Sequence, residues 1–244
     1  MKEIFTYMFN QDNCVKKISF FYGIIFAATV ILNFAAMYSP NNMLGEVTFL
    51  FFVFTFFGIL ALFLPCGYAV LNIKNHIDKK NELPNFDFNK IFITGFKFLV
   101  AFLILASIIA VIFFILGSLN ILFAHKHLSA LSFLVATTSF MITFIVLFLL
   151  NASVYRFAKT NDILAFVKLS DLNNMINKNV NKYFLSFILS TVILVTVFSA
   201  KYFLALYLIF YGILGLVIYS IVLSVILVYL TLVYTKVIAN SLEE

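Results

Sequence analysis

Few residues in this 244-residue chain are of the types that catalyse reactions or bind metals. His125 and His127 are separated by one residue, and imidazole is a common metal ligand. Two imidazoles without an acidic or cysteine partner nearby do not make a metal site, so we expect a solvated turn there. The chain contains no G-x-S-x-G, no glycine-rich phosphate loop and no H-E-x-x-H. The sequence therefore predicts no catalytic residue, no metal site and no cofactor, and a protein that is not an enzyme.

Several carboxylates lie between the apolar runs and could converge beneath a membrane. They are Asp78, Glu82, Asp87, Asp162 and Asp171. We expect solvated charges and helix caps, with Asp87 capping a helix that begins near Phe88. No acidic or basic residue falls near the centre of an apolar run. Because ionisable groups inside membranes mark proton relays and ion paths, this pattern argues against an ion-coupled transporter.

The composition is that of a membrane protein. Hydrophobic residues make up 64% of the chain and charged residues 11%, against about one half and about one quarter in soluble domains. A soluble fold could not cover that much apolar surface with polar groups. The cations interrupt the apolar runs and do not gather on one face, so we do not expect a nucleic-acid partner.

The apolar segments predict an all-α fold, a polytopic transmembrane helical bundle of six spans with amphipathic interfacial helices on the cytoplasmic side. Each segment is long enough to cross a hydrocarbon layer of about 30 Å as a helix. In a single domain over 1–244, the predicted spans are residues 18–38, 44–73, 98–123, 128–154, 183–204 and 209–236. The boundary between the fifth and sixth spans is the least distinct.

Smaller features of the chain carry further expectations. Residues 1–17 predict either a short interfacial helix or a partly ordered tail, and Gly95 predicts a bend after the helix that starts near Phe88. The mid-span Asn33, Asn120 and Asn151 predict hydrogen bonds between helices.

Two polar connections, residues 67–97 and 156–182, carry much of the charge and set the orientation. Fourteen of the sixteen cations lie in these connections and near the two termini, and only Lys126 and Lys201 lie on the opposite side. By the positive-inside rule, both termini and both connections are cytoplasmic, in the plasma or inner membrane. Apolar residues at helical spacing in the second connection predict one or two amphipathic helices on the membrane surface.

The two connections also carry the residues of a family resemblance. They are Gly67-Tyr68, Leu83-Pro84, Phe86-Asp87, Phe92, Gly95 and Lys97 in the first, and Arg156-Phe157-Ala158, Asp162 and Ala165-Phe166, leading to Tyr183, in the second. With them the chain resembles an uncharacterised family of prokaryotic multi-pass membrane proteins, catalogued as domain of unknown function 4013. The resemblance implies the topology and leaves the activity open. Members carry more arginine after the Gly-Tyr pair than the Leu71-Asn72-Ile73-Lys74 found here, which argues against phosphate binding.

The shared residues fit two roles. As a structural motif, Leu83-Pro84 would fix an extended entry, Phe86 would anchor it at the interface, and Asp87 would start the helix. As a docking motif, the two connections would form a surface for a cytoplasmic partner. The candidate residues for either role are Gly67, Tyr68, Leu83, Pro84, Phe86, Asp87, Gly95, Lys97, Arg156, Ala158, Asp162 and Phe166.

Two functions follow as hypotheses. The first is a non-catalytic integral membrane protein, an accessory, scaffold or lipid-interacting subunit that contacts the bilayer and a membrane or cytoplasmic protein or a second copy. The second is a permease or channel-like component that moves a small apolar or amphipathic solute without ion coupling. A continuous polar stripe on facing helices would favour the second, and a sealed apolar bundle would favour the first.

Overall fold

The computed structural model describes residues 14–37, 46–80, 82–178, 180–208 and 212–242. The long helices are α2 (Cys14–Met37), α3 (Glu46–Ile77), α4 (Phe88–His125), α5 (Ser129–Thr160), α7 (Val180–Leu208) and α8 (Gly212–Ser241). A short 3-10 helix, η2 (Ile163–Phe166), and α6 (Leu169–Lys178) lie between α5 and α7. Six helices are long and apolar enough to cross a bilayer, and the described residues include no strand. The predicted all-α polytopic bundle is therefore confirmed.

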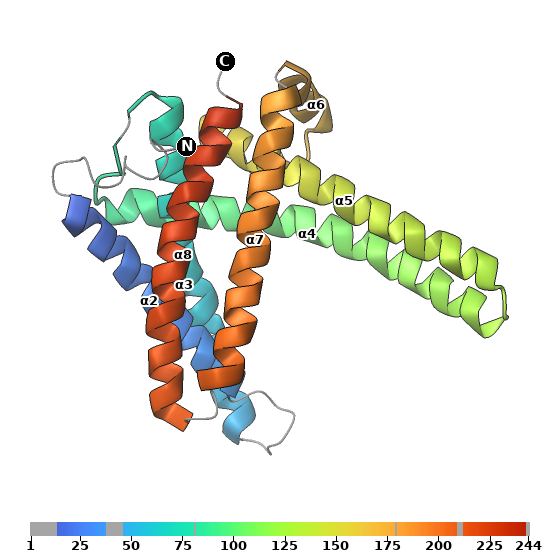
Figure 1. Ribbon diagram of the computed structural model, residues 1–244, viewed down its shortest axis with the longest axis horizontal. Helices are drawn as coiled ribbons and strands as arrows, with labels where there is room; N and C mark the ends of the chain where they lie inside the picture. Colours follow the sequence, from blue (N-terminus) through green and yellow to red (C-terminus); the bar gives the residue numbers. More distant parts are fainter. Residues whose placement is uncertain (1–13, 38–45, 81, 179, 209–211, 243–244) are drawn as a thin grey trace.

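The long helices form two groups (Figure 1). Helices α2, α3, α7 and α8 run roughly alongside one another, and α4 and α5 form an antiparallel hairpin that projects from them to one side. Helix α3 packs against α2, α4 and α8, and α7 packs against α8. The α3–α4 connection, α6 and the end of α8 lie together at the top of the view. The two polar connections of the sequence are thus gathered at one end of the bundle.

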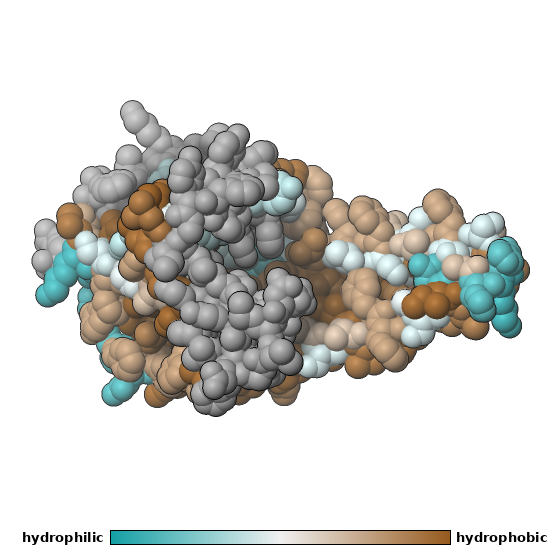
Figure 2. Space-filling model, turned by 90° about the horizontal axis from the view of Figure 1, so that it is seen from below, coloured by the Kyte–Doolittle hydropathy of each residue, from teal (hydrophilic) through white to brown (hydrophobic). Residues whose placement is uncertain are grey.

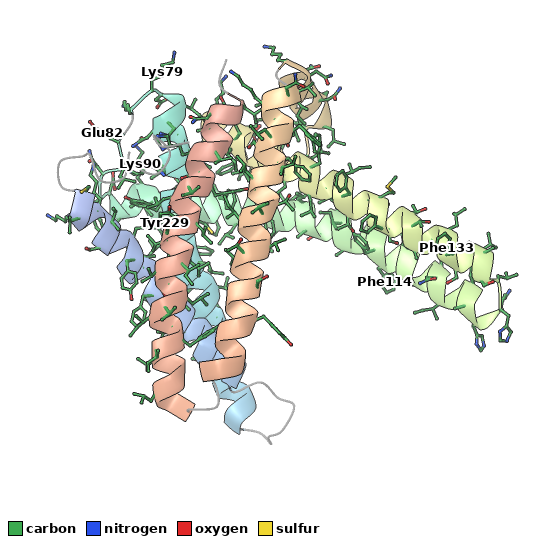
Figure 3. All side chains as sticks on the ribbon, viewed as in Figure 1. Lys79, Glu82, Lys90, Phe114, Phe133 and Tyr229 are labelled. Atoms are coloured by element: carbon green, nitrogen blue, oxygen red, sulfur yellow. The ribbon has the colours of Figure 1, made fainter. Side chains whose placement is uncertain are left out.

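The α4–α5 hairpin is packed against the rest of the protein only at its base. From Phe102 to Leu150, a stretch that the structure describes completely, Val135 alone is buried. Phe114 and Phe133 are 75% and 72% exposed and lie far from the bundle (Figure 3). The hairpin surface is largely hydrophobic up to a hydrophilic tip (Figure 2). Such a surface has to be covered by lipid or by another protein.

The core consists of two clusters of buried side chains. One cluster includes Phe21, Tyr68, Leu83, Ile91 and Leu232. The other includes Ile73, Phe157, Phe166, Leu172 and Tyr183. The first cluster contains side chains from the first connection, and the second contains side chains from both, so the connections are part of the core.

One sequence-based expectation was wrong, and a second is not shown by the structure. Helix α4 continues without interruption through Gly95, where a bend was predicted, because that glycine serves a close helix contact. The stretch predicted to hold one or two amphipathic surface helices forms η2 and α6, and Leu172 and Ile176 of α6 are buried in the protein core. This face of α6 is therefore not available to the membrane surface.

Three further expectations fall on residues outside the described set. These are most of the predicted interfacial helix in residues 1–17, the side chain of Asn33, and the boundary between the fifth and sixth spans at residues 209–211.

Candidate functional site

Gly67 of α3 and Gly95 of α4 meet where these two helices cross. A Cβ atom on Gly67 would overlap the carbonyl oxygen of Ile91, and one on Gly95 would overlap the carbonyl oxygen of Phe63. The Cβ position of Gly67 would also lie 2.9 Å from the backbone nitrogen of Gly95. Glycine is needed at both positions because the two backbones are in direct contact, the approach at which Cα–H···O contacts form.

Tyr68 and Leu83 fix the first connection to the bundle. The Tyr68 ring is 1% exposed and stacks on Phe21 of α2 with ring centroids 4.5 Å apart. Leu83 is also 1% exposed, and its carbonyl accepts a hydrogen bond of 2.8 Å from Lys17 Nζ. Pro84 next to it is buried, whereas Phe86 is exposed and contacts Phe20. The connection is therefore held against α2 by two aromatic contacts and by the hydrogen bond from Lys17.

Asp87 starts α4, as the sequence predicted. Its side chain accepts a hydrogen bond of 3.1 Å from the Lys90 backbone N–H, and the helix begins at Phe88. This capping satisfies one of the backbone donors that a helix start leaves unpaired. Lys97 lies farther along α4, two residues after Gly95, and is half-buried.

Arg156 of α5 holds α6 in place. Its side chain is 11% exposed and forms an ion pair with Asp171, and it also donates a hydrogen bond of 3.3 Å to the carbonyl of Lys168. A guanidinium can bind a backbone and a carboxylate acceptor at once because its donors are fixed in one plane. The only arginine of the chain therefore joins α5 to the start of α6.

Asp162 and Phe166 shape the turn between α5 and α6. The Lys168 ammonium lies 2.8 Å from the Asp162 carboxylate, and Leu164 N–H donates to the same side chain at 3.0 Å. Hydrogen bonds from Lys168 and then from Leu164 lower the pKa of Asp162 below its ordinary value. Phe166 is buried and packs edge-to-face on Phe98 of α4, with ring centroids 5.6 Å apart.

A cavity of about 440 Å³ brings the two connections together. We call it the connection cavity, and its lining includes Lys74, Asp87, Lys90, Ala158 and Asn161. Two lysines against one carboxylate favour an anionic ligand over a cationic one. Lys79, Glu82 and Lys90 project from this end of the molecule (Figure 3).

Few side chains at this end of the molecule are of the types that catalyse reactions or bind metals. Among the described lining residues of the connection cavity there is no histidine, cysteine or pair of carboxylates. No group of three or more metal-ligating side chains occurs in the described part of the chain. The carboxylates Asp87, Asp162 and Asp171 serve as caps and ion-pair partners. The side chains at this end can pack the two connections against the helices, and the connection cavity can hold a polar group.

Sequence reasoning missed the partners of the polar side chains inside the helices. Asn72 Nδ2 donates to Thr235 Oγ1 at 2.7 Å, and Tyr234 donates to Asn151 Oδ1 at 3.0 Å. The expected interhelical bonds of Asn120 and Asn151 are present, since Asn120 accepts from Ser132 of α5. No local pattern could have revealed these pairs, because Asn72 and Thr235 are 163 residues apart in sequence.

The Tyr183 hydroxyl was also missed as a helix contact. It donates to the carbonyl of Phe148 and accepts a hydrogen bond of 3.3 Å from the Ala152 N–H. Phe148 and Ala152 are four residues apart on α5, so one hydroxyl from α7 bonds to both the acceptor and the donor of a helical turn. This contact attaches the start of α7 to α5.

The fold and these contacts define a helical multi-pass membrane protein whose polar connections are anchored in its own core. A family model described as "Protein of unknown function (DUF4013)" matches residues 50–208. The chain belongs to this family, and the match includes both connections. Comparisons with curated proteins and with solved structures return no match.

Proposed function

We propose that this protein is non-catalytic and acts by association, as an accessory, scaffold or lipid-interacting subunit of a membrane. The observation that carries this proposal is the α4–α5 hairpin, which leaves the bundle and has Val135 as its one buried residue between Phe102 and Leu150. Helices in membranes associate by close packing of their surfaces. The hairpin instead offers a long apolar surface to lipid or to another membrane protein.

The use of the polar side chains supports the same proposal. Asn72 with Thr235, Asn151 with Tyr234, and Arg156 with Asp171 bind helix to helix. A permease or channel-like component would instead need polar groups along a continuous path on facing helices. These three pairs favour the first hypothesis because their hydrogen bonds and ion pair join neighbouring helices.

The placement in the cell belongs to the proposal as well. The connection end carries most of the cations, and cytoplasmic ends of membrane proteins are enriched in lysine and arginine. We therefore place both connections and both termini in the cytoplasm of a prokaryotic cell, with the spans in the plasma or inner membrane.

Photo-cross-linking in native membranes tests the proposal. A photoreactive residue is placed at Phe114 or Phe133 on the hairpin, and at Phe157 as the control, because Phe157 is fully buried. We expect the hairpin positions to capture defined protein or lipid species in stoichiometric amounts and the Phe157 position to capture none. Equal labelling of all three positions would contradict the proposal, and so would solute flux through vesicles that contain only the purified protein.

A further inference from the structure

The connection cavity is built where α3 and α5 end and α4 begins. Helix α3 contributes Lys74 from its last turn, α4 contributes Lys90 and its cap Asp87, and α5 contributes its C-terminal cap Asn161. The volume of about 440 Å³ lies within the ~300–1,000 Å³ typical of small-ligand sites. Asp87, Lys90 and Asn161 are exposed. A ligand can therefore reach the cavity from outside the protein.

The two lysines of the cavity are available to a ligand. In the part of the chain that the structure describes, neither Lys74 nor Lys90 forms an ion pair. Asp87, the one carboxylate of the described lining, accepts a hydrogen bond of 3.1 Å from the Lys90 backbone N–H. Helix α4 brings its positive end to the cavity, and α3 and α5 bring their negative ends. The side chains therefore decide the sign of the site, and they leave one net positive charge.

The second lysine changes what the sequence implied about phosphate. The segment Leu71-Asn72-Ile73-Lys74 offers one cation after the Gly-Tyr pair, which argued against phosphate binding. The structure brings Lys90 from another helix to the cavity that Lys74 lines. Lysine binds phosphate as a compact charge on a flexible stem, so two lysines on different helices can approach one phosphate group.

The position of the cavity indicates where a phosphate would come from. Lys74 directly follows the predicted end of the second span at residue 73, the level at which cations meet the lipid headgroups. Val70 and Leu71 precede Lys74 on α3, Ile93 follows Lys90 on α4, and all three line the cavity. Apolar wall residues therefore lie on the span side of both lysines. This order of charge and apolar surface matches a phospholipid better than a soluble phosphate ester.

We propose that the connection cavity binds the phosphate group of an anionic phospholipid. Lys74 and Lys90 are its cations, and the glycerol and the first methylenes of the lipid lie against Val70, Leu71 and Ile93. An anionic headgroup suits the site because a zwitterionic one would leave the net positive charge unbalanced. The inference rests on the lipid-interacting form of the proposed function and gives it a specific site and a headgroup charge.

The test compares two lipids with the same acyl chains. The purified full-length protein is incubated with equal amounts of dioleoyl phosphatidylglycerol and dioleoyl phosphatidylcholine, and the retained lipid is counted by native mass spectrometry. We expect the wild type to enrich the phosphatidylglycerol about fivefold, the effect of one net charge near a membrane surface. Equal retention of the two lipids would overturn the proposal.

Variants of single lysines locate the effect. Lys74→Gln and Lys90→Gln each remove one cation from the cavity, so the preference should fall to nearly one in both. Lys79→Gln is the matched control, because Lys79 is an exposed lysine of the same connection (Figure 3) and is not among the lining residues. An unchanged preference in Lys90→Gln would overturn the proposal. So would an equal loss in Lys79→Gln, which would show that the general surface charge attracts the lipid.

A variant of Asp87 should change the preference in the opposite direction. Asp87→Asn removes the opposing charge and keeps the helix start, because asparagine caps helices about as well as aspartate. The preference for phosphatidylglycerol should rise about fivefold above that of the wild type. A preference that stays the same or falls would contradict the assignment of the anion to this cavity.

A soluble competitor distinguishes the two sources of phosphate. Glycerol phosphate carries the phosphate group without acyl chains, and in large excess it should leave most of the phosphatidylglycerol bound. Complete displacement would overturn the assignment to a lipid and indicate a soluble phosphate ester as the ligand. Hairpin cross-linking does not depend on this cavity, so it can succeed where the headgroup preference fails.

Discussion

Single residues control how closely α3 and α4 approach. Gly67 and Gly95 leave no room for a Cβ, because each would meet a backbone carbonyl of the other helix. A backbone atom cannot rotate away as the end of a side chain can. The two helices must therefore separate if either position gains a methyl group, and the packing of Tyr68 and Ile91 beside them would loosen.

The first prediction concerns these glycines. Gly67→Ala and Gly95→Ala should each destabilise the protein by about 1–3 kcal/mol, the usual effect of overpacking. Gly117→Ala on α4 is the control, since a Cβ there has no neighbour within 4 Å, and it should be neutral or stabilising because alanine is the better helix former. Unfolding of the three variants in detergent gives the comparison. A loss of stability in Gly117→Ala equal to that in Gly95→Ala would contradict the account.

The second prediction concerns Asp162 and pH. Its pKa is lower in the folded protein than the ordinary value of 3.8, so the contacts with Lys168 and Leu164 stabilise the folded state above about pH 4. This contribution is lost as the pH falls through the lowered pKa. Asp162→Asn should therefore unfold at a lower temperature than the wild type at pH 7, and the two midpoints should converge below pH 3. A difference that stays constant with pH would show that the charge of Asp162 is not involved.

The role of a residue could be predicted from the sequence where its partners are close in the chain, and could not be predicted where its partner lies on another helix. Asp87 was predicted as a cap because capping depends on residues three positions apart. The role of Gly95 was mistaken for a bend, because its partner Phe63 lies on another helix and no local pattern shows a helix crossing. The same holds for Asn72, whose partner Thr235 comes from the far end of the chain.

At the scale of elements, α6 depends on one residue of α5. The Arg156 guanidinium is nearly buried and Asp171 is half exposed, with 51% of its side chain accessible. Leu172 beside it is fully buried. The ion pair thus fixes the start of α6 while its apolar side enters the core, which explains why this helix packs on the protein.

The third prediction tests this attachment. Asp171→Asn removes the counter-charge of a nearly buried arginine and should destabilise α6 by about 1–2 kcal/mol, less than for a fully buried pair because water reaches Asp171. The reactivity of a Leu172→Cys thiol, with Cys14 and Cys66 replaced by alanine, reports the loosening. It should rise in Asp171→Asn and stay unchanged in Asp78→Asn, whose exposed carboxylate lies in the other connection. Equal reactivity in both variants would contradict the role of the ion pair.

The length of α4 bears on how the hairpin can sit in a membrane. Its 38 residues span about 57 Å at 1.5 Å per residue, against a hydrocarbon thickness of about 30 Å. The excess length allows α4 to cross the membrane with its axis strongly inclined to the membrane normal. This agrees with the hairpin running crosswise to α2, α3, α7 and α8 (Figure 1).

At the scale of the whole molecule, the composition predicted the architecture better than it predicted single residues or the packing of single helices. The apolar runs gave the six helices because a membrane requires long apolar segments whose backbone groups bond within the segment. The outward projection of the hairpin could not be predicted, since its surface is equally apolar on all sides and carries no periodicity that marks a packed face. The sequence also could not predict that the connections are buried in the core, because a docking role and a structural role use similar residues.

The sidedness of the connections is the most direct test of the account. Single cysteines at Lys79, Asn173 and Lys126, in a protein with Cys14 and Cys66 replaced by alanine, are labelled with a membrane-impermeant thiol reagent in right-side-out and inverted vesicles. All three positions are exposed in the folded protein. The account predicts that Lys79→Cys and Asn173→Cys react only in inverted vesicles and Lys126→Cys only in right-side-out ones. Reaction of Lys126→Cys on the same side as the two connections would show that the hairpin does not cross the membrane, and would contradict the six-span account.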